Sequence, residues 1–357
     1  MKPLLFAIAA VLVLGADDPK AGLDIYFIDV DGGAATLLVT PERKSVLIDS
    51  GWPGRDDRDP KRIVHVLRNV AGLERIDHLV TTHWHTDHFG GVEGLAKLVP
   101  IDRFWDRGLP EDGTAGLDFP DGPKSEDPLG IAYRRASQGK RKALKSGDTL
   151  PLGNQISAMV LTSGGKVYRE DDDLSKPINR FCENSPADLP VDGSDNARSL
   201  TLIFRFGNFD FLDCGDLTWN IEKKLVCPVD RIRLSDPKQR QDNVVDLFQV
   251  THHGMDISNH PTLLKTIQPT VAVMDNGPKK GGAPATVKLM VSQPSIKAFY
   301  QLHKNAATGA EENTSPDLIA NSDPVGGQFI KVSVVPDGSK YTVQIGGNGV
   351  AKEFETR

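Results

Sequence analysis

The 357-residue chain has few cysteines, no excess of positive charge and a single long apolar run. Its formal net charge of −6 argues against broad electrostatic adhesion to nucleic acid or to anionic membranes, so we expect no stable nucleic-acid binding. Hydrophobic residues make up 39% of the chain and charged residues 25%, which is typical of a soluble globular protein. Beyond residue 14, no segment is long and apolar enough to predict a membrane span.

The one apolar run lies at the N-terminus. Lys2 precedes apolar residues 4–14, and small and acidic residues follow, which is the order of a secretory signal peptide. An uncleaved anchor is the alternative, but eleven apolar residues are too few to span a bilayer comfortably. We therefore predict a signal peptide at 1–16, cleaved after Ala16. The mature protein would then be exported to the periplasm or the extracellular space, with no membrane attachment.

Three cysteines are an odd number for an oxidising compartment. Cys214 ends the apolar run FDFLDCGD, and we expect it to be a buried small hydrophobic residue. Cys182 and Cys227 lie in loop-like surroundings and could form one disulfide. The sequence alone does not fix the pairing.

The chain reads as two halves in which strands are followed by helices. Strands are expected at 23–30, 36–40, 45–51 and 78–82 in the first half, and at 244–250, 270–275, 327–335 and 340–346 in the second. Residues 199–216 are expected to form a hairpin with a Gly-Asn turn. Helices are expected at 61–72, 90–99, 262–268 and 286–293. Two such halves predict an α/β protein with a four-layer αββα sandwich. Residues 108–142 and 164–195 are rich in Gly, Pro, Asp and Lys and are predicted to be two loop insertions.

The string THWHTDHFGG, residues 82–91, crowds three of the nine histidines into six residues. Protonated imidazoles repel one another and neutral ones need partners, so a shared metal ion would resolve the conflict. His83 and His85 flank Trp84 and would point to one side of an extended loop, while Asp87 and His88 can turn toward a second position. Imidazole and carboxylate ligands suit zinc. A histidine-rich surface loop is the alternative, but chance rarely produces this spacing.

This string, followed by Gly90 and Gly91, resembles the metal motif of the metallo-β-lactamase fold superfamily. The segments 27–39, 195–219 and 249–261 are similar to those of its ComEC-type members. The resemblance extends from about residue 23 to residue 346 and implies one hydrolase domain, which we place at 23–350, with the αββα fold of the superfamily.

Carried over by position, the resemblance implies a pair of metal sites. His83 and His85 would hold one ion, and Asp87 and His88 would hold the second. Asp216 would bridge the two ions, together with a hydroxide. Either Asp87 or Asp216 could orient that hydroxide, which makes Asp87 a predicted catalytic residue as well as a metal ligand.

The resemblance also implies residues around these ligands. Asp49 would support the ligands from a strand end without contacting the metal. One of His252 and His253 would complete the second site, and His252 is favoured because it comes first after the strand. His253 would then be a catalytic proton donor or a substrate contact.

The chain departs from many superfamily members in one respect. It has no histidine between residues 89 and 251, where another ligand of the first site is expected. Asn196 could substitute weakly or hold a water, and capping of a turn is an equal alternative. We therefore expect the second site to bind metal more tightly than the first.

A glycine-flanked pair of lysines, Lys279 and Lys280, follows a predicted strand, as in an anion-binding loop. A solvated turn is the alternative reading. His303, at the end of another strand, is a third predicted substrate contact.

The expected chemistry is hydrolysis, because zinc lowers the pKa of bound water to roughly 7. One or two zinc ions are predicted, with manganese or iron as alternatives. The ComEC-like resemblance implies a small-molecule or short phosphoester substrate, including phosphodiesters. A lactonase or amidase, including a β-lactamase, is the alternative enzyme, since fold does not fix substrate. A non-catalytic, metal-stabilised binding module is the alternative outside the enzymes.

Overall fold

The structure, a computed structural model, describes residues 21–112, 121–172, 178–238 and 245–357. The predicted signal peptide, 1–16, lies outside the described residues. Within them, no helix has both the length and the apolar character required to span a bilayer.

The first sheet has nine strands in the order β17-β16-β15-β1-β2-β3-β4-β5-β6. Strands β1 to β3 form an antiparallel meander, and β3 to β6 run parallel. Strands β15 to β17 add antiparallel to the free edge of β1. The bounds are β1 Leu23–Phe27, β2 Thr36–Val39, β3 Ser45–Ile48, β4 Ile76–Val80, β5 Ile101–Asp106, β6 Arg141–Ala143, β15 Ile330–Val334, β16 Lys340–Ile345 and β17 Lys352–Glu355.

The second sheet has eight strands in the order β14-β13-β12-β11-β10-β9-β7-β8. Strands β10 to β14 run parallel, while β9 and β7 are antiparallel neighbours. The β9–β10 hairpin turns at Gly207 and Asn208, as predicted from the Gly-Asn pair. The bounds are β7 Ile156–Ser163, β8 Lys166–Val167, β9 Thr201–Phe206, β10 Phe209–Asp213, β11 Leu247–Gln249, β12 Val271–Met274, β13 Ala298–His303 and β14 Ile319–Asn321.

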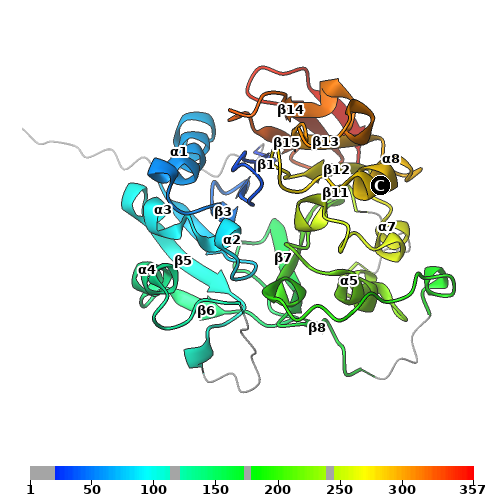
Figure 1. Ribbon diagram of the computed structural model, residues 1–357, viewed down its shortest axis with the longest axis horizontal. Helices are drawn as coiled ribbons and strands as arrows, with labels where there is room; N and C mark the ends of the chain where they lie inside the picture. Colours follow the sequence, from blue (N-terminus) through cyan, green and yellow to red (C-terminus); the bar gives the residue numbers. More distant parts are fainter. Residues whose placement is uncertain (1–20, 113–120, 173–177, 239–244) are drawn as a thin grey trace, which may run out of the picture.

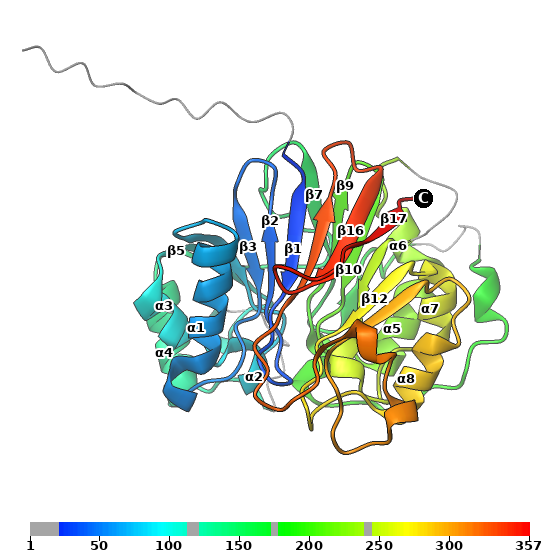
Figure 2. The ribbon, with the colours of Figure 1, turned by 90° about the horizontal axis from the view of Figure 1, so that it is seen from above.

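The two sheets pack face to face, and helices cover their outer faces (Figure 2). Helices α1, α3 and α4 cover the first sheet, and α5, α7 and α8 cover the second. Alternating apolar residues of both sheets form the central core, and a separate apolar core fills each sheet–helix layer. The predicted αββα sandwich is therefore confirmed. The helix bounds are α1 Arg58–His65, α2 Thr86–Phe89, α3 Val92–Leu98, α4 Pro128–Ser137, α5 Trp219–Val226, α6 Arg231–Leu234, α7 Pro261–Ile267 and α8 Pro284–Val291.

The first insertion, 108–142, is not only a loop, which corrects the sequence-based expectation. It contains α4, which begins after Asp127, whose side chain accepts a hydrogen bond from the backbone N–H of Leu129. Tyr133 of α4 is buried edge-on against Trp84, with ring centroids 4.9 Å apart. The helix was missed because its hydrophobic face is short and lies among turn-forming residues.

The second insertion, 164–195, contains β8 and short 3₁₀ turns. A disulfide joins Cys182 of this insertion to Cys227, next to the end of α5, which confirms the pairing that the sequence left open. Cys214 is buried and free, as expected. At the C-terminus, β17 continues the first sheet past residue 350, where the domain was predicted to end.

Candidate metal centre

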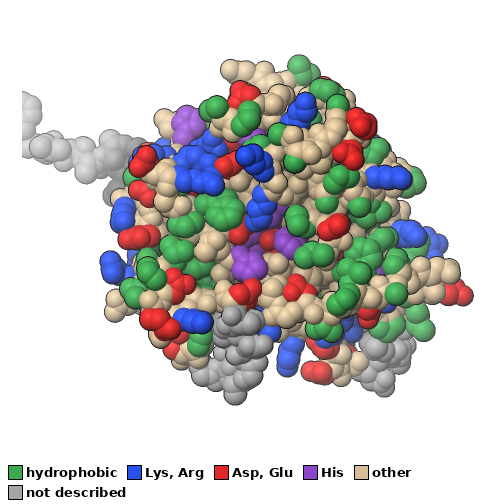
Figure 3. Space-filling view, in the orientation of Figure 1, with side chains coloured by type: hydrophobic (Ala, Val, Ile, Leu, Met, Phe, Trp, Pro, Cys, Tyr) green, Lys and Arg blue, Asp and Glu red, His purple; other side chains and the backbone are tan. Residues whose placement is uncertain are grey.

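The histidine-rich cluster lies where the two sheets meet. The motif follows β4 and leads into α2, which Figure 1 shows between the two halves of the molecule. Asp216 follows β10, and His252 and His253 follow β11. These loops leave the carboxyl ends of their strands, where open α/β sheets typically carry ligand sites. Figure 3 shows histidine side chains at the bottom of a hollow in this face, with acidic and basic side chains around them.

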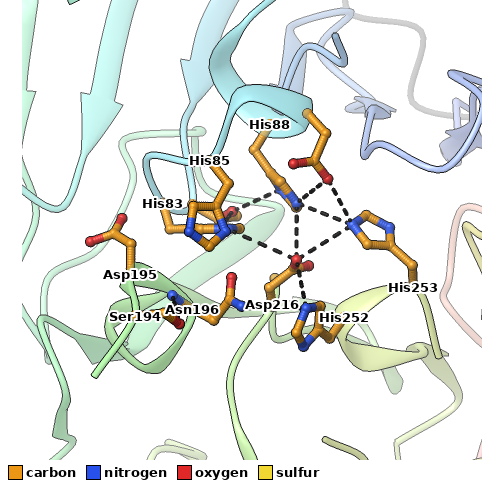
Figure 4. A network of polar contacts seen from close by, with 12 residues as sticks. His83, His85, His88, Ser194, Asp195, Asn196, Asp216, His252 and His253 are labelled. Carbon is orange, nitrogen blue, oxygen red and sulfur yellow. Dashed lines mark hydrogen bonds and ion pairs between the residues drawn. The ribbon is translucent and has the colours of Figure 1, made fainter. Parts of the chain in front are cut away.

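Among the described residues, two groups of side chains could each hold a metal ion. Ligand atoms within 4.8 Å of one another define one group of His83, His85 and Asp216 and another of Asp87, His88, Asp216 and His253. Asp216 belongs to both groups and lies between them (Figure 4). This is the sharing that the resemblance implied for Asp216, while its role as a metal ligand stays a prediction.

His83 provides a test of whether a cation fits. The Thr82 hydroxyl donates to Asp49 Oδ2 at 2.7 Å, so its oxygen accepts a hydrogen bond from the N–H at His83 Nδ1, 3.1 Å away. His83 Nε2 therefore carries a lone pair, and it is buried with no hydrogen-bond partner among the described residues. Burial, above all, holds the pKa of His83 well below its usual range. A buried lone pair 3.9 Å from Asp216 Oδ2 is an arrangement that a metal ion would satisfy.

The second group concentrates opposite charges out of water. His88 Nδ1 lies 2.7 Å from Asp49 Oδ2, and its Nε2 faces Asp216 at 3.2 Å and Asp87 at 3.3 Å. Burial lowers the pKa of His88, but the three carboxylates outweigh burial and hold that pKa well above its usual value. Burial raises the pKa of Asp216, but the surrounding imidazoles hold it well below the usual range. Asp49 contacts His88 and belongs to neither ligand group, and its supporting role at a metal site stays a prediction.

The two adjacent histidines exchange the positions that the sequence analysis favoured. His253 Nε2 lies 3.1 Å from Asp87 Oδ2 and 3.4 Å from Asp216 Oδ2, within the second group. His252 Nε2 instead faces Asn196 Nδ2 at 3.3 Å and Asp216 Oδ2 at 3.5 Å. The cause is a turn in which both residues are left-handed, with φ of 56° and 52°, so the strand direction does not continue through them. Such backbone strain is common at functional sites.

Asn196 lies beside the first group, buried to 7% exposure, with its amide directed to His252. The turn that it belongs to is capped by Ser194, whose hydroxyl accepts from the Asn196 N–H at 3.3 Å. Asn196 does not act as the cap that was considered as its alternative role. Its part in holding a metal or a water stays a prediction.

Three residues that the sequence analysis missed hold the motif loop. The Trp84 N–H, between His83 and His85, donates to Asp195 Oδ2 at 2.6 Å, and Asp195 forms a buried ion pair with Arg107. Asp121 Oδ2 lies 2.7 Å from His85 Nε2. Asp195 adjoins Asn196 in a segment that the resemblance had already marked. Nothing in the glycine-rich surroundings of Asp121 distinguishes it from a turn aspartate.

Only one of the three predicted substrate contacts reaches the centre. Lys280 Nζ contacts the Asp87 carboxylate and lies 5.1 Å from the centroid of the Trp52 ring. The loop that carries Lys280 packs so closely on His253 that a Cβ added to Gly281 would clash with the His253 carbonyl oxygen. Lys279 points to solvent.

His303 is not at the centre. It is buried, with Nε2 2.6 Å from Asp29 Oδ1, and Asp29 also pairs with Arg62. In this network, His303 joins the end of β13 to the chain just after β1. The prediction that His303 contacts substrate is therefore replaced by the observed role, a contact between the two sheets.

Comparison with known proteins matches residues 28–158, which include the whole motif, to the family model of the metallo-beta-lactamase superfamily. ComE operon protein 3 of Bacillus subtilis is 24% identical over 266 residues, covering 71% of this chain and 28% of that protein. A metal-dependent hydrolase of Cupriavidus necator is 24% identical over 181 residues, covering 44% of this chain and 58% of that protein. The chain thus spans less than two thirds of either relative.

Among solved structures, the metallo-beta-lactamase fold protein YhfI of Bacillus subtilis aligns with a TM-score of 0.42 and 10% identity, over 78% of this chain and 95% of that one. CmlA, a diiron beta-hydroxylase from Streptomyces venezuelae, aligns with a TM-score of 0.35 and 16% identity, over 70% of this chain and 44% of that one. The match to the metallo-beta-lactamase superfamily model thus covers the segment that carries the histidine-rich motif, and that segment lies in an αββα sandwich.

Proposed function

We propose that this protein is an exported, zinc-dependent hydrolase of small phosphoesters and phosphodiesters, with manganese or iron as alternative metals. The observation that carries the proposal is the sharing of Asp216 by two ligand groups, because a carboxylate common to both groups could help to hold two metal ions. Two adjacent ions lower the pKa of coordinated water and stabilise the charge that develops in phosphoryl displacement. Imidazole and carboxylate donors are the ligand types that zinc prefers.

The residues around the two groups have separable roles. Asp87 belongs to the second group and also contacts Lys280, and its carboxylate can orient a water molecule. Lys280 offers a point charge for an anionic substrate, which suits phosphate. Trp52 lies beneath the ammonium group and shapes that side of the opening.

His252 is proposed as a proton acceptor, a role that differs from the proton donor that the sequence analysis predicted at His253. The Ser258 hydroxyl donates to Leu217 O at 2.8 Å, so its oxygen accepts from His252 Nδ1 at 3.1 Å. His252 Nε2 is therefore unprotonated and faces Asp216. Burial lowers the pKa of His252, which favours its neutral form, and a neutral imidazole can act as a proton acceptor.

The substrate is proposed to be short. A protein with a net charge of −6 is poorly suited to long polyanions, which need several lysine or arginine contacts. One cation beside two metal ions is enough for a small phosphoester. Export is supported by the apolar run at 4–14 and by the Cys182–Cys227 disulfide, since disulfides persist in oxidising compartments.

The test loads the purified protein with zinc, manganese or ferrous iron and measures hydrolysis of bis-nitrophenyl phosphate beside a lactone and a β-lactam. We expect the phosphodiester to be cleaved preferentially. Asp216→Asn should lower the amount of metal bound per protein molecule. It should also lower kcat by about a hundredfold or more. The matched control is His65→Ala, which removes an exposed histidine outside the cluster.

Other outcomes of this test would contradict the proposal. Efficient lactone or β-lactam cleavage without phosphodiester cleavage would support the alternative enzyme, and bound metal with no turnover would support a binding module. Export is tested separately by mass spectrometry of secreted protein, whose N-terminus should lie near Asp17. An intact Met1 in a cytoplasmic fraction would refute it.

A further inference from the structure

Each histidine of the cluster turns one ring nitrogen toward a partner at the periphery. A histidine that binds metal through one nitrogen commonly donates its other N–H to a carboxylate or another acceptor, which fixes its tautomer and orientation. The hydrogen-bonding partners are Thr82 for His83 (3.1 Å), Asp49 for His88 (2.7 Å), Ser258 for His252 (3.1 Å) and Asp121 for His85 (2.7 Å). His253 Nδ1 lies 3.4 Å from Asp275 Oδ1 without forming a hydrogen bond to it. Asp121 differs from the others because it comes from the insertion at 108–142.

Asp121 is held at two points. Its Oδ2 lies 2.7 Å from His85 Nε2, and its Oδ1 accepts from the backbone N–H of Asp195 at 2.9 Å. Asp195 in turn accepts from the Trp84 N–H and pairs with buried Arg107. The two insertions therefore meet over the His83–His85 loop, and Asp121 is fixed to the segment that also fixes the loop.

The hydrogen bond determines which atom of His85 can bind a metal. An ionised carboxylate only accepts, so His85 Nε2 must carry the proton and Nδ1 must carry the lone pair. His83 has the opposite arrangement, with the proton on Nδ1 and the lone pair on Nε2. Two neighbouring histidines thus have their ligand atoms selected by different partners, and both belong to the group that contains Asp216.

The first metal site of this chain depends strongly on the orientation of His85, because the third histidine expected at that site is missing. There is no histidine between residues 89 and 251. Among the described residues, the first group contains two histidines and the shared Asp216. His85 is also partly exposed, with 26% of its side chain accessible, so packing alone does not fix its ring.

We propose that Asp121 is the positioning residue of the first metal site, holding His85 so that Nδ1 faces the ion and offsetting the missing third histidine. This inference rests on the metal centre of the proposed function. It assigns a role in metal binding to the insertion at 108–142, whose described residues contribute no ligand to either group.

The test measures stepwise zinc affinity by competition with a chelating dye. In Asp121→Ala we expect the weaker step to lose affinity by roughly 10- to 100-fold, as for other histidine-orienting partners, with the tighter step unchanged. Asp121→Asn should restore much of the loss, because the amide oxygen can still accept from Nε2. The matched control is Glu126→Gln, which changes an exposed carboxylate of the same insertion that hydrogen-bonds its neighbour Ser125.

A second readout separates positioning from direct ligation or damage. Cobalt-loaded Asp121→Ala should keep the shape and intensity of the visible absorption bands once saturated, because no ligand has been removed. Unchanged zinc affinity, a changed cobalt spectrum or equal weakening of both steps would each overturn the inference. If the unsubstituted protein binds no metal, the proposed function fails together with the inference. If it binds two ions without hydrolysing anything, only the proposed function fails.

Discussion

At the scale of single residues, Lys280 connects the glycine-rich loop after β12 to the metal groups. Its ammonium group contacts Asp87 and lies over the Trp52 ring, whereas the adjacent Lys279 is exposed. Two lysines that are equivalent in the sequence therefore differ in the structure. The difference supplies a matched pair of variants for testing substrate binding.

We expect Lys280→Ala to raise KM for a phosphodiester about tenfold or more, because hydrogen bonds to charged groups contribute about 1.5–3 kcal/mol. Metal content should stay unchanged, and Lys279→Ala should behave like the unsubstituted protein. Steady-state kinetics with metal analysis of each variant checks both expectations. Equal effects of the two substitutions would show that the loop acts only through its overall charge.

At the scale of secondary-structure elements, regular patterns were predictable and local turns were not. The strands around β4 and β10 were predicted because buried apolar runs alternate with turn residues. Asp49 and Asp216 were predicted from the resemblance of their segments to the superfamily. The exchange of His252 and His253 depends on two left-handed residues in succession, which no sequence pattern specified. Asp121 reaches His85 through tertiary contacts between two insertions. Local sequence does not encode such contacts.

The second insertion is an element whose attachment can be tested. The Cys182–Cys227 disulfide closes a segment of 45 residues between this insertion and the end of α5. Closing a loop of that length restricts the unfolded chain and typically stabilises the folded state by about 2–4 kcal/mol. The double variant Cys182→Ser, Cys227→Ser should lose about that much free energy of unfolding in urea titration. Dithiothreitol should lower the stability of the unsubstituted protein and leave the double variant unaffected. If dithiothreitol lowered the stability of the double variant as well, its effect on the unsubstituted protein would not come from reduction of this disulfide.

At the scale of the whole molecule, the metal centre joins the two halves of the sandwich. Asp87 and His88 follow β4 in the first sheet, whereas Asp216 and His253 follow β10 and β11 in the second. A metal ion bound by these four side chains would therefore link the two sheets at one end. The apolar core between the sheets holds them together over the rest of their length. Metal binding and global stability should consequently be coupled.

Zinc should raise the melting temperature of the whole protein, because an ion that binds the folded chain and not the unfolded one stabilises it by mass action. At a free zinc concentration 100 times Kd, one site contributes about 2.7 kcal/mol. Thermal scans over a zinc series buffered by a chelator should show Tm rising with the logarithm of zinc concentration above Kd. In Asp216→Asn, which weakens both groups at once, the rise should begin only at much higher zinc. His65→Ala, which removes an exposed histidine, should follow the unsubstituted protein. A Tm independent of zinc in protein that demonstrably binds it would mean that the site forms equally well in the unfolded chain, which is incompatible with ligands drawn from both sheets.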